Sequence, residues 1–252
     1  MNDVTKRKMG LRLMALTLLP VLLLATGGVL GKGLLAEPGN YQEVTFDDSE
    51  ATNHAGPGPD PEFESNKYNL VNGGIKWPSG TVKYKLDLPL EMAHLEGAVL
   101  DAVKTLNTAL GGSLVFERNN LEADENPCAA GSTNTVNTIN FGAPGQIDGD
   151  GGVLASTAAC FNTKTKVIVG FRMRFDYDDF DNGESDVTNV GTHEMGHVVG
   201  LAHVNGAKDG CLTMYKFSGL GETHKSSLGW GDLRGLDALY DTGKPGEQLA
   251  CE

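Results

Sequence analysis

Residues 193–203 read His-Glu-Met-Gly-His-Val-Val-Gly-Leu-Ala-His, and this run combines three histidines with one glutamate at spacings suited to metal chemistry. His193 and His197 are four residues apart, so on a helix they lie on one face and can reach the same ion. Gly200 is expected to end that helix, because glycine adopts the left-handed conformation without a Cβ penalty. The chain can then turn back and bring His203 to the same ion. Three histidine ligands leave the fourth position of a tetrahedral zinc site open to water, as in catalytic sites.

Glu194 follows the first histidine and supplies the base that hydrolysis requires. Zinc bound by three neutral imidazoles lowers the pKa of its water from 15.7 to about 7. Glu194 is placed to take the proton of that water and to deliver it to the departing amine, while zinc polarises the scissile carbonyl. We therefore predict a zinc-dependent endopeptidase with Glu194 as the catalytic residue. The alternative is a non-catalytic zinc-containing binding or adhesive module of the same fold, against which the intact glutamate argues.

The elements that must position these residues are expected to form an α+β domain with a mixed sheet. Alternating patterns rich in β-forming residues predict five strands, at 81–87, 113–118, 136–141, 152–161 and 166–176. Apolar residues at helical spacing predict three helices, at 89–110, 187–200 and 232–240.

The N-terminal part of the chain has the composition of an export signal. Basic residues between 6 and 12 precede an uncharged, leucine-rich stretch at 13–31. This order is typical of a secretory leader, and its length is close to that of a short membrane span. We assign residues 1–36 to a signal peptide or an N-terminal membrane anchor and favour cleavage. Either assignment predicts an extracellular protein, secreted or anchored at the outer face of the cytoplasmic membrane.

An acidic segment follows the leader. Between Glu37 and Glu64 there are eight acidic residues and no lysine or arginine. Low hydrophobicity with charge of one sign predicts a disordered linker, which we place at 37–74. The folded domain is then expected at 75–252. The net charge of −13 argues against nucleic acid as a partner, because binding to phosphates needs clustered lysine and arginine.

Four cysteines, an even number, fall within the predicted domain, and in an exported chain they suggest two disulfides. Three pairings are open. We favour Cys128 with Cys160 and Cys211 with Cys251. Metal ligation is not expected of them, because no two have Cys-x-x-Cys spacing.

Met214, in Cys-Leu-Thr-Met-Tyr, lies eleven residues after His203. With the extended histidine motif, it resembles the methionine turn of the metzincin metallopeptidases, in which the methionine packs beneath the metal. Over residues 75–240 the chain is most similar to the matrixins. This resemblance implies a metzincin-type catalytic domain: a mixed, mostly parallel five-stranded sheet with two long helices and a C-terminal helix. It is carried by Trp-Pro-x-Gly at Trp77, Ile147-Asp-Gly-Asp-Gly-Gly-Val-Leu-Ala, and Gly-Asp-Leu-x-Gly-Leu-x-Ala-Leu-Tyr from Gly231.

The resemblance extends to metals besides the catalytic zinc. In matrixins a glycine-rich loop of this form binds calcium, which here would pair Asp148 with Asp176 and Asp179. Carboxylates and freed carbonyls are suitable calcium ligands, but a glycine-rich turn with solvated carboxylates is the open alternative. Animal matrixins also hold a structural zinc through histidines, where this chain has Ser156 and Arg174. We therefore predict one zinc ion, the catalytic one.

The resemblance also concerns substrate and latency. The strand near 153–159 is expected to be the sheet edge along which an extended peptide pairs, and a pocket beside 214–217 to set side-chain preference. Lys216 stands where a proline is usual. No cysteine precedes Cys128, so the thiol switch of matrixin propeptides is absent. We expect a monomer that acts on proteins or peptides.

Overall fold

The computed structural model describes residues 40–50, 63–120, 126–128, 137–142, 152–181, 183, 185–219 and 221–251. The predicted leader and Asp148 lie outside these residues. Among the described residues, no helix is long and apolar enough to cross a bilayer.

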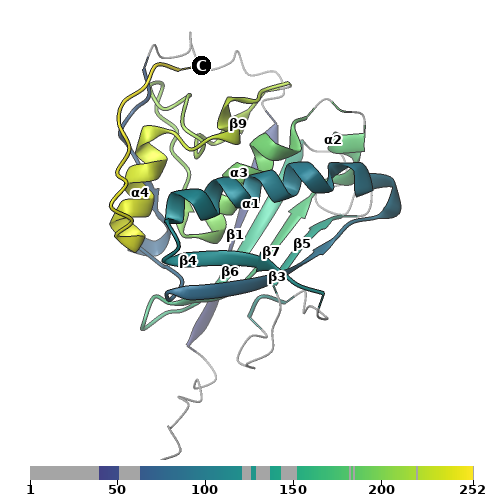
Figure 1. Cartoon of the computed structure of the whole chain (residues 1–252), viewed down its shortest axis with the longest axis horizontal. Coiled ribbons are helices and arrows are strands. Elements are labelled where there is room, and N and C mark those ends of the chain that lie inside the picture. Colours follow the sequence, from purple (N-terminus) through teal and green to yellow (C-terminus); the bar gives the residue numbers. More distant parts are fainter. Residues whose placement is uncertain are drawn as a thin grey trace, which may run out of the picture. The chain divides into compact units, whose positions relative to one another are not determined.

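Seven strands form the main sheet, in the order β4-β3-β5-β7-β6-β1-β9 (Figure 1). Parallel pairing joins β3 (Gly80–Asp87) to β4 (Leu114–Arg118) and β5 (Asn137–Phe141), and β5 to β7 (Ile168–Phe175). β6 (Val153–Asn162) is antiparallel to β7 and to β1 (Tyr41–Glu50), and β1 is parallel to β9 (Phe217–Ser218). The mixed, mostly parallel α+β sheet is as expected, with β1 and β9 added to the five predicted strands.

The segment expected to be a disordered linker, 37–74, contains ordered structure instead. β1 runs along β6, and its side chains Val44 and Phe46 pack against the core while Thr45 and Asp47 are exposed. The composition of this segment predicted disorder because composition carries no information about a strand elsewhere in the chain with which the segment can pair. Pairing with β6 provides hydrogen-bond partners for the backbone of β1. Because side chains alternate along a strand, two apolar side chains face inward while polar and charged ones stay in water. A two-stranded sheet, β2 (Asn69–Leu70) with β8 (Leu201–Ala202), also begins within this segment.

Two long helices lie on one face of the sheet (Figure 1). The predicted helix at 89–110 is a 3₁₀ turn, η2 (Leu90–Leu95), followed by α1 (Glu96–Leu110). α3 (Val187–Val198) packs beside α1 and carries the histidine motif. Asp186 caps its N-terminus by accepting a hydrogen bond from the Asn189 N–H at 2.7 Å. The shorter helices and turns are η1 (Val71–Gly73), α2 (Tyr177–Asp181), η4 (His224–Ser226) and α4 (Trp230–Tyr240).

The C-terminal end of α3 is held by side chains from distant elements. Trp77 Nε1 donates to the Val198 carbonyl at 2.8 Å, and the Tyr240 hydroxyl donates to the Val199 carbonyl at 2.9 Å. These donors satisfy carbonyls that a helix end leaves without partners. Gly200 then turns the chain with φ +94°, in the left-handed region, and a Cβ there would overlap the Ile75 carbonyl oxygen. The expected termination of the helix at this glycine therefore has both a conformational and a steric cause.

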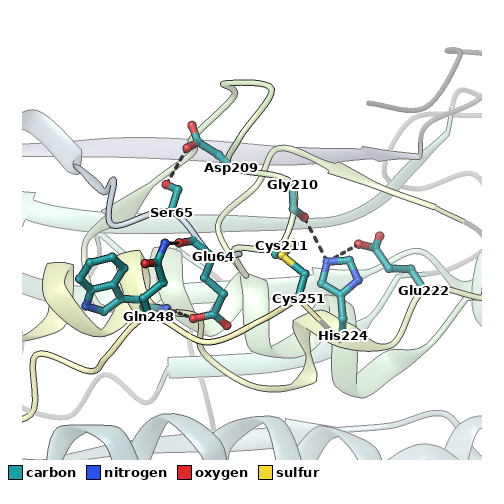
Figure 2. The surroundings of a disulfide bond; sticks show 10 residues. Glu64, Ser65, Asp209, Gly210, Cys211, Glu222, His224, Gln248 and Cys251 are labelled. Atoms are coloured by element: carbon teal, nitrogen blue, oxygen red, sulfur yellow. Dashed lines mark hydrogen bonds and ion pairs between the residues drawn. A yellow bond between two sulfur atoms is a disulfide. The ribbon is translucent and has the colours of Figure 1, made fainter. Parts of the chain in front are cut away.

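Two disulfides join Cys128 to Cys160 and Cys211 to Cys251, which is the pairing we favoured. The second ties the C-terminal tail to the loop after the histidine motif, as Figure 2 shows. Nearby, the Glu64 carbonyl accepts from Gln248 Nε2 at 3.1 Å, so the tail is also held by hydrogen bonds. In the chain-entropy account, closing loops of 32 and 40 residues stabilises the fold by about 4 kcal/mol each.

Candidate metal centre

The three histidines of the motif converge on one point. Their Nε2 atoms are separated by 3.1 Å between His193 and His197, 3.0 Å between His197 and His203, and 3.1 Å between His203 and His193. Among the described residues they are the one group of three or more potential metal-ligating side chains. His193, Glu194 and His197 lie on α3 and are buried, while His203 is partly exposed.

The third histidine is positioned by the turn after α3. From Gly200 the chain enters β8, which pairs antiparallel with β2. Asn69 of β2 donates from Nδ2 to the His203 carbonyl at 2.7 Å. The two-stranded sheet therefore fixes the backbone on which His203 stands, so part of the predicted linker helps to build the site.

The outer nitrogens of two rings are engaged by carbonyl oxygens. His193 Nδ1 lies 2.5 Å from the Thr213 oxygen, and His197 Nδ1 lies 2.9 Å from the Leu201 oxygen. A carbonyl oxygen only accepts, so each Nδ1 carries the proton and each Nε2 presents its lone pair. A tetrahedral zinc ion with Zn–N bonds of 2.0–2.1 Å needs its nitrogens about 3.3 Å apart. Lone pairs meeting at 3.0–3.1 Å therefore fit a zinc ion, which would remove their mutual repulsion.

Met214 lies under the motif helix. Its side chain is 2% exposed, and a Cβ on Gly196 would overlap its Sδ atom. Backbone hydrogen bonds join this turn to the segment after His203, from the Val204 N–H to the Met214 carbonyl at 2.9 Å and from the Lys216 N–H to the Val204 carbonyl at 3.0 Å. The absence of a side chain at Gly196 thus makes room for the methionine.

Comparison with known proteins agrees with this arrangement. The matrixin family of peptidases, Peptidase_M10, matches residues 135–241, which include the triad, the methionine turn and α4. Mouse stromelysin-3 is 37% identical over 102 residues, covering 39% of this chain and 18% of stromelysin-3. Over residues 135–241 the chain is therefore similar to the matrixins.

Two solved structures are also similar. Myroilysin covers 68% of this chain and 97% of its own, at 14% identity and a TM-score of 0.39. Metalloproteinase-II from Bacteroides fragilis covers 64% of this chain and 56% of its own, at 12% identity and a TM-score of 0.29.

The other metal positions of the matrixin resemblance are described in part. Ser156 on β6 lies directly opposite Arg174 on β7, so the two positions expected to lack a structural zinc do face one another. Asp176 is buried at the end of β7, and its Oδ1 accepts from the Asp178 N–H at 2.9 Å. Asp179 lies in α2 close by in sequence. Because Asp148 is outside the described residues, calcium binding by these carboxylates stays a prediction.

Asp232 has a larger role at the site than its position in the sequence indicated. It lies in the first turn of α4, and its carboxylate is fully buried. Three backbone N–H groups donate to it, from Thr213 at 2.8 Å, Gly229 at 3.0 Å and Met214 at 3.2 Å. Burial raises the pKa of Asp232, and these three donors oppose the rise. Asp232 therefore holds the methionine turn, whose Thr213 carbonyl in turn receives His193. The sequence signal is an acidic residue three positions after a glycine, at the start of the predicted helix 232–240.

Lys225 is a second residue that sequence reasoning missed. Its side chain is 1% exposed, and its Nζ donates to the Tyr215 carbonyl at 3.2 Å and to the Phe217 carbonyl. Its backbone N–H donates to Asn189 Oδ1 on α3 at 2.7 Å. Lys225 thus anchors the segment expected to form the specificity pocket to the motif helix. Lysine is almost never fully buried unless it is paired, so nothing in the sequence gave reason to expect a buried lysine here.

Glu222 and His224 form an ion pair beside Lys225, with 3.0 Å between His224 Nε2 and Glu222 Oε1 (Figure 2). Burial favours a higher pKa for Glu222, but the hydrogen bond from His224, the charge of Lys225 and the Gly219 N–H outweigh it and lower the pKa to about 2. The hydrogen bond to Glu222 raises the pKa of His224 against the effect of burial. The pocket segment is therefore flanked by a carboxylate, Glu222, that is ionised at neutral pH, beside Lys225 and His224.

Proposed function

We propose that this chain is a zinc-dependent endopeptidase that hydrolyses proteins or peptides. The convergence of three Nε2 lone pairs, with Glu194 on the helix that carries two of these histidines, is the observation behind the proposal, and the match to the matrixin family supports it. In this proposal His193, His197 and His203 hold the zinc ion, Glu194 is the general base, and Met214 is a packing residue.

Zinc, when bound, would supply an activated water and polarise the carbonyl of the scissile bond. The chain's own residues have separate tasks. His193 and His197 keep their Nδ1 protons on backbone carbonyls, which orients both rings. Glu194 is fully buried next to His193, and in this low-dielectric environment it would accept the proton of the attacking water and transfer it to the departing amine.

The remaining assignments are part of the same proposal. Residues 1–36 serve as a leader or anchor, and the domain works outside the cytoplasm, where its two disulfides are stable. It acts as a monomer and binds no nucleic acid. Calcium at Asp148, Asp176 and Asp179 would stabilise the end of β7.

The test compares the purified chain with Glu194→Ala on casein, gelatin and a peptide library, with and without a chelator. We expect hydrolysis that the chelator abolishes, faster in the Phe46→Ala background described below, and a loss of about 10²–10⁴-fold on adding Glu194→Ala, with one zinc ion per chain throughout. Two zinc ions per chain would contradict the assignment at Ser156 and Arg174. Equal inertness of the wild type and Glu194→Ala, also in the Phe46→Ala background described below, with zinc retained, would instead favour the binding module.

A further inference from the structure

The sheet edge expected to receive a peptide is already occupied in this chain. β1 pairs antiparallel with β6 from Tyr41 opposite Asn162 to Ser49 opposite Val153. In the strand order, β6 lies between β7 and β1, so β1 takes the place that an added peptide strand would need. Backbone pairing along an edge admits one strand at a time.

β1 also lies over the metal centre and reaches the pocket segment. The Phe46 ring stacks on the His197 ring, with 4.2 Å between centroids and 6° between planes. It meets the His203 ring edge-on, with centroids 6.3 Å apart. Beyond Phe46, Ser49 pairs with Phe217 and Glu50 with Ser218, both on β9. One segment therefore covers the pairing edge, two of the three histidines and the wall of the expected pocket.

We propose that Tyr41–Glu50 is an intramolecular inhibitor, which occupies the peptide-binding groove and keeps the site closed until the strand leaves. This inference rests on the proposed function, because it takes the β6 edge as the substrate groove. The blockade uses backbone pairing and an aromatic ring. A thiol on the metal has no part in it, because Tyr41–Glu50 contains no cysteine.

The way in which β1 is held makes its release feasible. All four cysteines pair with one another downstream of it, so no disulfide ties β1 to the domain. Among its described side chains, Val44 and Phe46 pack on the core, while Gln42, Glu43, Thr45 and Asp47 are exposed. A strand with a purely structural role would stabilise the fold but would not compete with a substrate peptide for pairing with β6. The experiments therefore measure competition between β1 and an added peptide.

The first experiment measures peptide binding without turnover. The full chain carrying Glu194→Gln is loaded with zinc and titrated into a fluorescein-labelled synthetic peptide of sequence YQEVTFDDSE, which copies β1, with anisotropy as the readout. Removing the ring with Phe46→Ala weakens the internal strand, and the apparent Kd falls by the factor by which the open population rises. We expect about tenfold tighter binding, from the lost ring stacking and burial. Unchanged binding would overturn the inference.

Two controls separate the ring from general damage to the strand. Phe46→Tyr keeps the stacked ring and should bind the peptide like the parent. Thr45→Ala alters the neighbouring exposed residue and should also match the parent. Tighter binding in Thr45→Ala equal to that in Phe46→Ala would contradict the role given to the ring.

A second form of the protein keeps the inference testable if Phe46→Ala does not fold. A recognition site for a specific protease is placed between residues 52 and 60 of the Glu194→Gln chain, which is cut after folding and passed over a sizing column. Loss of the N-terminal fragment with tighter binding of the labelled peptide supports the inference. Loss of the fragment without any gain in binding overturns it.

The outcomes also separate this inference from the proposed function. If Phe46→Ala tightens peptide binding but no form of the chain hydrolyses a substrate, the inhibitor stands and the peptidase proposal fails. If the wild type hydrolyses casein and Phe46→Ala changes neither the rate nor the binding of peptide, the peptidase stands and the inhibitor fails.

Discussion

Replacement of Asp232 by alanine should weaken the metal centre, although none of the hydrogen bonds of the Asp232 carboxylate named here goes to one of the three histidines. Its carboxylate accepts the N–H groups of Thr213, Met214 and Gly229, and the Thr213 carbonyl holds His193 Nδ1. The substitution therefore acts on the metal centre through one intervening turn. It should affect stability and zinc affinity together.

The magnitude follows from the three donors. A buried N–H that loses its acceptor costs about 1–3 kcal/mol, so three would cost roughly 3–9 kcal/mol. Removing a fully buried carboxylate also relieves its desolvation, which is the cause of the raised pKa of Asp232, and water entering the cavity can satisfy part of the loss. We expect a net loss of about 3 kcal/mol, at the lower end of the range for three lost acceptor contacts. Loss of a partner that orients a metal ligand typically weakens metal affinity by about 10–100-fold.

Urea unfolding of the metal-free chain, with disulfides intact, measures the stability term. Competition with a fluorescent zinc chelator measures the affinity. Asp232→Asn retains one acceptor oxygen and should lie between alanine and wild type in both assays. Asp101→Asn, at an exposed position on α1, serves as the matched control and should change the unfolding free energy by less than about 0.5 kcal/mol. A loss below 1 kcal/mol with unchanged zinc affinity in Asp232→Ala would refute the account.

Two further predictions concern the turn and the pocket flank. Gly196→Ala should destabilise the domain by about 1–3 kcal/mol, because its methyl group meets Met214 Sδ. Adding Met214→Ala removes that clash and should recover part of the loss caused by Gly196→Ala. Strictly additive losses in the free energy of urea unfolding would contradict the steric account. Glu222, whose pKa is lowered to about 2, contributes stability that is present above pH 4.5 and lost as the pH falls toward 2, by up to about 3 kcal/mol. His224, whose pKa is raised, adds stability below pH 6.5 that declines as the pH rises through its raised pKa. Urea midpoints of the metal-free wild type and Glu222→Gln should therefore converge between pH 4.5 and 2.5, and a constant gap would rule out Glu222 as the source.

The parts of the site that the sequence predicted are local. The spacing of His193 and His197, the turn at Gly200 and the return of His203 depend on one helix and one glycine, so short-range rules suffice. Asp232 and Lys225 act through contacts with backbone groups 8 to 19 residues earlier in the chain. These are Thr213 and Met214 for the aspartate, and Tyr215 and Phe217 for the lysine. No periodicity or motif marks such contacts, because the partners are main-chain atoms whose positions depend on the tertiary fold.

β1 poses a different question, because its composition predicts disorder and the structure shows a strand. An isolated segment with two inward apolar side chains and several acidic ones cannot bury enough surface to order itself. Paired with β6, it needs no core of its own, because the sheet supplies backbone partners and His197 supplies a surface for Phe46. On the inhibitor proposal, the composition describes the released segment and the structure describes the bound one. The exposed Glu43 and Asp47 are consistent with both the bound and the released state. Their side chains stay in water while the strand is paired, and their charges favour a solvated segment once it has left.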